Sequence, residues 1–415
     1  MIVKVSLKSL KTGMYITNPG LSIKSNPEIL LTDLEIKNDN QLKKITCAKF
    51  SDIFIDTEKG SFFKANPQKK FEVERLFQTF GDYKYYDGTK SSHFDNIISS
   101  VTKSNSDYSA FIEYCKKFLT EIKENEKIDI SASKEFINTI IDNDDETNGA
   151  TLFLMNLRNH DEYTYTHCIN VSLYATIFGK HLSLGRENLM LLGLAGLYHD
   201  IGKIKISEKI LKKPGKLTES EFKEIKNHPI YSCELLAASG ITSNEINRTV
   251  LEHHERYGGL GYPNGLSSTE ISHSAALLSI VDSYDALRSD RYYKSAVHSH
   301  KAVSVIFNSK KSSYSPSLVD KFVKFIGIYP IGSIVVLSND KKGIVISQGN
   351  KSLLQPIVRI ILDENNRHCQ PYDISLDDYI ESTGPLRIVD CLNNKQCRIH
   401  LTSYIKNLGV EINAN

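Results

Sequence analysis

The chain has 415 residues, 40% of them apolar and 24% charged, which is typical of a soluble globular protein long enough for two or three domains. Its 51 basic and 49 acidic residues give a formal charge of +2, so no whole-molecule field favours nucleic acid or an anionic membrane. No window approaches the roughly 18 apolar residues of a membrane span, and the 7 scattered cysteines, which form no CxxC pair, indicate reduced thiols in a cytoplasmic protein.

The amino-terminal part of the chain has the alternation of short β-strands. "VKVSL" alternates apolar and polar residues, which predicts a strand and not a secretory signal. "FSDIFIDTEKG" predicts another strand followed by a turn. Residues 61–107 are rich in Lys, Ser, Asp and Asn without clean periodicity, which predicts connecting structure. We therefore assign residues 1–107 to a β-rich amino-terminal domain with its connecting segment.

Helical patterns dominate from residue 108 to residue 328. Amphipathic segments over 108–149 predict a helical linker, and 150–328 is helical almost throughout, with His167 on the same face as the apolar residues of "THCINVSLYATIF". Strands return in 329–415, where "GSIVVLSNDKKGIVIS" predicts a hairpin. The expected fold is mainly α, with a helical core flanked by smaller β-rich amino-terminal and carboxy-terminal regions.

The stretch "LEHHERYGGLGYPNGL" sets two adjacent histidines, His253 and His254, before a glycine-rich turn. Adjacent helix residues point about 100° apart, so one core pocket rarely needs both imidazoles, and metal coordination is a better reason for the pair. Further candidate ligands lie within or at the ends of predicted helices: His167, His199, Asp200, His228 and Asp282. Helical bundles build di-metal sites from such inward-facing side chains.

This ligand set contains imidazoles and carboxylates but no thiolate, which suits iron, manganese, nickel, cobalt or zinc. Because the set is larger than one tetrahedral ion uses, we expect two ions, with Asp200 able to bridge them. Two metals about 3.5–4 Å apart can clamp both oxygens of an in-line phosphoryl displacement and lower the pKa of a bound water. The residues therefore favour hydrolysis at phosphorus.

Several motifs together resemble one family. "HDIGK", "HP" and "HHE…GYP", followed by "DSYDAL" and "SDRYYK", are similar to the HD-GYP subgroup of the HD phosphohydrolases over residues 163–328. "LKTGMYI" with "IFIDTEKG" resembles the domain that often precedes HD-GYP domains in bacterial signalling proteins. The resemblance implies a helical-bundle HD-type metallophosphohydrolase core that hydrolyses a cyclic dinucleotide, with cyclic di-GMP expected first and 3′,3′-cyclic GMP-AMP next.

The resemblance also assigns roles to residues. Its metal ligands are His167, His199, Asp200, His228, His253, His254 and Asp282, and iron or manganese is expected before nickel, cobalt or zinc. Asp200 and Lys203 are the expected catalytic residues. Lys203, Arg291 and Lys294 are the expected substrate contacts.

The chain departs from the family pattern at two informative places. The loop motif HHExxDGxGYP has Gly258 in place of its aspartate, which puts loop rigidity and full activity in question. The glutamate that three-metal members carry one turn before the first histidine is Tyr163 here, which favours two metals. For Asp285, bracing of the structure or of a ligand is expected, and for Glu255 contact with the site and plain loop support both stay open.

Two functions of different classes remain. The first is a metal-dependent cyclic-dinucleotide phosphodiesterase that releases a linear dinucleotide, and the second is a catalytically impaired module that binds a cyclic dinucleotide or a protein. We expect a cyclic dinucleotide as partner, no nucleic-acid polymer and no membrane span. A diguanylate cyclase-type signalling partner and a homodimer stay open, as do the choice of base and a mononucleotide end product.

Overall fold

The computed structural model of the chain has two compact units, residues Met1–Tyr83 and Lys84–Asn415. The description that follows covers residues 2–6, 10–16, 34–46, 52–61, 92–125, 128, 130–157, 163–289, 297–349, 351–377, 380–381 and 384–392. In these ranges no helix combines the length and the apolar character needed to cross a bilayer.

The first unit is built on a four-stranded antiparallel sheet in the order β1-β4-β2-β3. Its elements are β1 (Ile2–Ser6), β2 (Met14–Ile16), β3 (Leu34–Glu35), helix α1 (Asp39–Thr46) and β4 (Asp52–Gly60). Ile36 before the helix, Ile45 within it and Ile55 on β4 are all buried, so both the helix and the sheet of this unit contribute apolar side chains to its interior. The β-rich amino-terminal region expected from the sequence is confirmed.

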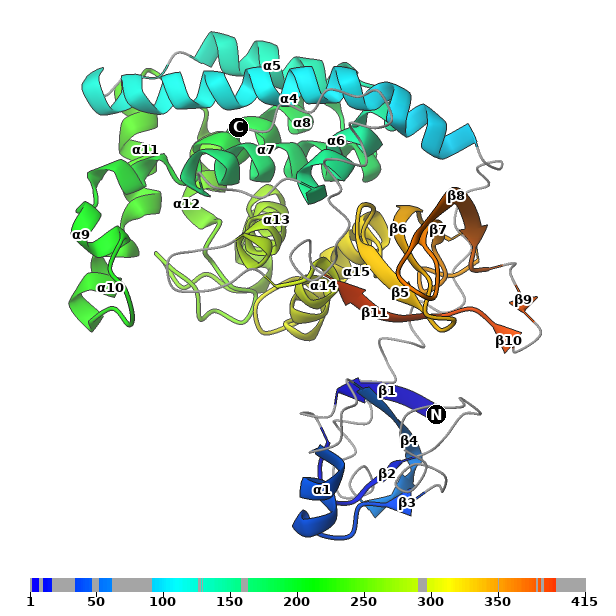
Figure 1. The fold of residues 1–415 in the computed structure, drawn as a ribbon. Helices are drawn as coiled ribbons and strands as arrows, with labels where there is room; N and C mark the ends of the chain where they lie inside the picture. Colours follow the sequence, from blue (N-terminus) through cyan, green and yellow to red (C-terminus); the bar gives the residue numbers. More distant parts are fainter. Residues whose placement is uncertain are drawn as a thin grey trace. The chain divides into compact units, whose positions relative to one another are not determined.

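Helices make up most of the second unit (Figure 1). In chain order they are α4 (Ser92–Asn125), α5 (Ile130–Asp142), α6 (Asp145–Leu157), α7 (Tyr163–His181), α8 (Arg186–Tyr198), the 3₁₀ helix η2 (Ile201–Lys205), α9 (Glu208–Leu211), α10 (Glu219–Ile225), α11 (His228–Ala238), α12 (Asn244–Glu252), the 3₁₀ helix η3 (Ser268–Glu270), α13 (His273–Arg288), α14 (Ser299–Asn308) and α15 (Pro316–Ile326). The mainly α class is confirmed.

The long helix α4 packs along α6 and α7, and α5 packs against α7 and α8 (Figure 1). The boundary expected at residue 107 therefore falls inside α4, and the segment 108–149 belongs to the same bundle as the helices that follow it. The buried face of α4 includes Val101, Tyr108 and Phe111, and its earlier turns use Ser104 and Asn105 on that face. These polar residues hide the helical periodicity from a reading based on apolar residues.

Capping residues and a proline determine where α10 and α11 begin and end. Thr218 and Glu221 form a capping box at the start of α10. That helix ends at Ile225, and α11 begins at His228 with Pro229 in its first turn, where proline's missing N–H leaves no bond unmade. The chain therefore passes from α10 to α11 within two residues, which places His228 at the start of a helix.

The carboxy-terminal part folds as a five-stranded antiparallel sheet in the order β11-β5-β6-β7-β8. Its strands are β5 (Ile334–Leu337), β6 (Lys342–Ser347), β7 (Ile357–Leu362), β8 (His368–Ser375) and β11 (Ile388–Leu392), and β9 (Ile380–Glu381) pairs with β10 (Gly384–Pro385). Ile344 and Ile361 pack in one buried cluster with Val101 of α4 and Phe153 of α6. The predicted hairpin corresponds to β5 and β6, and the sheet shares a core with the bundle.

Candidate metal centre

The predicted ligands lie on or directly beside α7, α8, η2, α11, α12 and α13, and the fold gathers them into two groups. His199 is the C-cap of α8, Asp200 is the N-cap of η2, and His253 is the C-cap of α12. Gly202 makes this convergence feasible, because a Cβ at this position would lie 2.1 Å from the backbone oxygen of His228. The glycine of "HDIGK" thus lets η2 pack directly on the start of α11.

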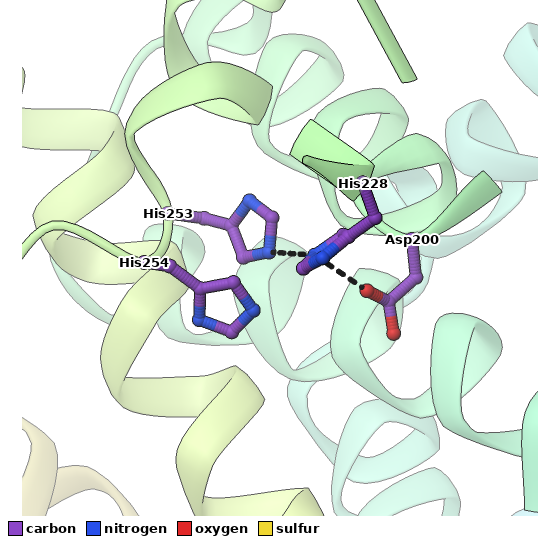
Figure 2. A group of neighbouring side chains, drawn as sticks. All are labelled: Asp200, His228, His253 and His254. Carbon is purple, nitrogen blue, oxygen red and sulfur yellow. Dashed lines mark hydrogen bonds and ion pairs between the residues drawn. The ribbon is translucent and has the colours of Figure 1, made fainter. Parts of the chain in front are cut away.

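The ligand atoms fall into two groups, each of which could hold one ion. In each group the ligand atoms lie within 4.8 Å of one another, and the groups are Asp200, His228, His253 and His254, and His167, His199 and Asp282. Figure 2 shows the first group, with its three imidazoles and the carboxylate gathered together. Among the described residues, every predicted ligand therefore belongs to one of the groups.

Asp200 lies between the two groups. Its Oδ1 is 3.2 Å from Nε2 of His228, and its Oδ2 is 3.3 Å from Nε2 of His199 and 3.7 Å from Nε2 of His167. Asp282 closes the second group, with Oδ1 3.2 Å from Nε2 of His167. A carboxylate with one oxygen toward each group has the geometry that a bridging ligand needs.

Backbone carbonyls fix the tautomers of three ligands. The Nδ1–H groups of His199, His228 and His253 donate to carbonyl oxygens at 2.7, 2.7 and 2.6 Å. Because a carbonyl can only accept, the neutral form of each of these imidazoles carries its lone pair on Nε2, the atom that faces the cluster. The Nε2 atoms of His228 and His253 lie 3.4 Å apart, so two lone pairs oppose each other unless a cation lies near them.

Other buried atoms also fit a cation. Within the described ranges, Nε2 of His199 and Nδ1 of His254 are buried and make no hydrogen bond. The carboxylates of Asp200, Asp282 and Asp285 are all buried within the same region. Buried negative charge requires compensation, and divalent metal ions would supply it.

The pKa values of the cluster favour ionised Asp200 and Asp282 and neutral imidazoles at His253 and His254. Burial and the neighbouring histidines hold the pKa values of His253 and His254 well below the ordinary value. Burial opposes ionisation of Asp200, but contacts with His199 and Lys203 hold its pKa well below the usual range. Burial also opposes protonation of His167, yet hydrogen bonds to Asp282 and Asp285 raise its pKa to about 9.

Lys203 lies beside the cluster, as the sequence predicts. Its Nζ donates to Oδ2 of Asp200, and its side chain is 27% exposed, so it borders both the ligands and solvent. The other predicted substrate contacts, Arg291 and Lys294, lie outside the described residues.

Lys226 and Tyr262 form a feature that the sequence reasoning missed. The Tyr262 ring lies 4.7 Å from the His254 ring, and Nζ of Lys226 lies 5.6 Å from the centre of the Tyr262 ring. The ammonium group of Lys226 thus lies over the ring of Tyr262, which is itself next to the ligand His254. The position of Lys226 two residues before His228 is the signal that could have found it.

The glycine-rich loop after His254 is held by side-chain and backbone bonds. The buried carboxylate of Glu255 accepts from the backbone N–H groups of Asn264 at 2.7 Å and Leu266 at 2.9 Å. On the loop's other side, the N–H of Gly258 donates to the carbonyl of Ser312 at 3.0 Å. Glu255 therefore supports the loop, and the loop is ordered although Gly258 replaces the motif aspartate.

Comparison with known proteins shows which family the region around this cluster resembles. The HD domain family model matches residues 152–318. A cyclic di-GMP phosphodiesterase of Pseudomonas aeruginosa is 37% identical over 218 residues, which are 52% of this chain and 52% of that protein. The cyclic di-GMP phosphodiesterase response regulator RpfG of Xanthomonas campestris pv. campestris is 36% identical over 155 residues, 37% of this chain and 41% of that protein.

A relative named for a different substrate also matches. The 3′3′-cGAMP-specific phosphodiesterase 3 of Vibrio cholerae is 30% identical over 168 residues, 40% of this chain and 36% of that protein. The chain spans about half or less of the length of these curated relatives. The segment that matches the HD domain family, residues 152–318, includes all seven residues of the two ligand groups.

Proposed function

We propose that this chain, which belongs to the HD domain family and carries the HD-GYP motifs, is a metal-dependent phosphodiesterase that hydrolyses a cyclic dinucleotide. The observation that carries the proposal is the pair of adjoining ligand groups joined by Asp200. The names of the relatives support cyclic di-GMP as first substrate and 3′,3′-cyclic GMP-AMP as second. We assign the catalytic domain to residues 150–328.

The two ligand groups would each hold one divalent ion; the donor set suits iron, manganese, nickel, cobalt or zinc, and the resemblance to the HD-GYP subgroup puts iron or manganese first. When bound, two such ions would supply positive charge to the scissile phosphate and lower the pKa of a water. The chain's own contribution is to hold the imidazoles and carboxylates of the two groups in place. It does so through the carbonyl bonds of His199, His228 and His253.

The reaction adds one water across a phosphodiester. A bond forms between the water oxygen and phosphorus, the bond from phosphorus to the 3′ oxygen breaks, and the 3′ oxygen takes a proton. Lys203 is proposed to contact a phosphate oxygen and to give that proton, because its ammonium group borders the cluster. The product is a linear dinucleotide with a 5′-phosphate.

Lys226 and Tyr262 are proposed as further substrate contacts beside Arg291 and Lys294. The ammonium of Lys226 suits a phosphate, and the Tyr262 ring that it contacts lies beside His254 of the first ligand group.

The function is tested with full-length protein, stripped of metal and reloaded anaerobically with iron(II) or manganese(II). Cyclic di-GMP and 3′,3′-cyclic GMP-AMP are supplied in parallel, and products are separated by chromatography. Linear product from the wild-type chain and none from Asp200→Ala is the expected result, and the faster substrate defines specificity. Stoichiometric metal without turnover of either substrate would favour the binding module instead.

A further inference from the structure

The first ligand in the chain, His167, ends a buried chain of hydrogen bonds that starts on α4. The hydroxyl of Tyr108 donates to Oδ1 of Asn170 at 2.7 Å, and Nδ2 of Asn170 donates to Oδ1 of Asp285 at 2.9 Å. Oδ2 of Asp285 lies 2.8 Å from Nδ1 of His167. Their exposed fractions are 1% for Tyr108, Asn170 and Asp285 and 2% for His167.

The donor and acceptor types of these four side chains fix the direction in which each hydrogen bond of the series is donated. An ionised Asp285 can only accept, so the amide group of Asn170 must face it and His167 must donate from Nδ1. The carbonyl oxygen of Asn170 is then turned toward Tyr108, whose hydroxyl can donate to it. Nε2 of His167 is left to face Asp282 at 3.2 Å, on the side where the ligand groups lie.

We propose that Tyr108 is a positioning residue for metal binding, acting through Asn170 and Asp285 to hold the tautomer and ring orientation of His167. The inference rests on the proposed function, because it takes His167 as a metal ligand. The other described histidines of the cluster with fixed tautomers donate to carbonyls near them in sequence, whereas His167 depends on residues from α4 and α13.

The location of Tyr108 gives the network its significance. Residue 108 lies on α4 (Ser92–Asn125), upstream of the segment 152–318 that matches the HD domain family. α4 is also the first described helix after the amino-terminal unit along the chain. The metal affinity of the HD domain therefore depends on a helix that the family match does not include.

The test is a titration of the metal-free chain with manganese(II). The electron paramagnetic resonance signal of free manganese measures how much of the metal is bound. Tyr108→Phe keeps the ring and removes the donor. We expect it to weaken binding at one of two sites about tenfold, the low end for groups that hydrogen-bond metal ligands. Tyr114→Phe is the matched control, because it removes a hydroxyl from the same helix whose partner is Ser133.

A double variant separates positioning from general damage. Asp285→Asn is expected to weaken the same site by roughly 10–100-fold. If Tyr108 acts through Asp285, adding Tyr108→Phe to Asp285→Asn causes no further loss. Unchanged affinity in Tyr108→Phe, or an equal loss at both sites with a lower melting temperature, overturns the inference. A wild-type chain that binds no manganese instead overturns the proposed function itself.

Discussion

Helix ends explain why the imidazoles of this site are oriented before any ion binds. The last carbonyls of a helix lack intrahelical partners, and a histidine placed at that end can donate Nδ1–H to one of them. His199 does so to Gly196, His228 to Ile225 at the end of α10, and His253 to Val250, each three residues back along the chain. One local bond thus leaves Nε2 as the ligand atom.

Replacing one such histidine should weaken metal binding by the ligand group to which it belongs. His199→Ala removes the Nε2 atom that lies 3.3 Å from Asp200, so we expect lower bound metal and a loss of phosphodiesterase activity of more than about 100-fold, beyond the usual effect of groups that only support ligands. Metal content by mass spectrometry and turnover are measured together. His273→Ala, at an exposed histidine of α13, is the control and should leave both unchanged. Full metal content in His199→Ala would remove His199 from the ligand set.

Lys203 should affect chemistry without affecting metal binding. Lys203→Met removes the ammonium group beside Asp200, and we expect kcat to fall by about 10²–10⁴-fold, the usual range for general acid catalysis, with metal retained. Lys205→Met is the matched control on the same short helix, because Lys205 pairs with Glu234 on the surface. An equal loss of activity in both variants would argue against a specific role for Lys203.

At the scale of elements, the glycine-rich loop shows how a motif residue can be replaced. The loop's backbone is bonded to Glu255 on one side, and the carbonyls of Ser312 and Ser313 accept from Gly258 and Tyr257 on the other. A Cβ at position 258 would lie 2.9 Å from the Ser312 carbonyl oxygen. The turn between α14 and α15 thus occupies the space that a side chain at 258 would need.

Restoring the family aspartate should therefore harm this chain. Gly258→Asp forces the Ser312 backbone away, and we expect a loss of about 1–3 kcal/mol in the free energy of unfolding, as for other overpacked sites, together with lower kcat/KM. Denaturant unfolding and kinetics measure the two effects. Gly185→Asp introduces the same side chain at the N-cap of α8, where a Cβ meets nothing within 4 Å, and should be neutral or stabilising. A more active and equally stable Gly258→Asp would contradict this account.

The seven side chains that the sequence singles out lie together in the structure, and most of them belong to short motifs of histidine and aspartate; their role as metal ligands stays a prediction. The sequence predicted the elements from 150 to 328 because their apolar residues recur with helical spacing. It could not predict the bond between Tyr108 and Asn170, since these residues are 62 positions apart and their pairing depends on how α4 packs on α7. For the same reason the support of His167 by Asp285, 118 positions away, required the fold.

At the scale of the whole second unit, the bundle, its upstream helices and the carboxy-terminal sheet share buried contacts. Phe153 of α6 lies in one cluster with Ile344 and Ile361 of the sheet and Val101 of α4. Ile137 of α5 is buried as well, and α5 packs on α7 and α8. A fragment of residues 150–328 alone would therefore lose the packing partners that α4, α5 and the carboxy-terminal sheet provide in the whole chain.

A fragment of residues 150–328 should consequently fail to unfold cooperatively, whereas a fragment of residues 92–392 should behave like the full chain. Removing α4, α5 and the sheet exposes Phe153 and the buried faces of α7 and α8, and exposed apolar area costs about 25 cal/mol per Å². Differential scanning calorimetry of both fragments, with manganese(II) present and absent, measures the transition. Because the shorter fragment also lacks Tyr108, we expect weak manganese binding from it even where it retains helical structure. A cooperative transition of 150–328 at the melting temperature of the longer fragment would instead show that this domain folds independently of α4 and the sheet.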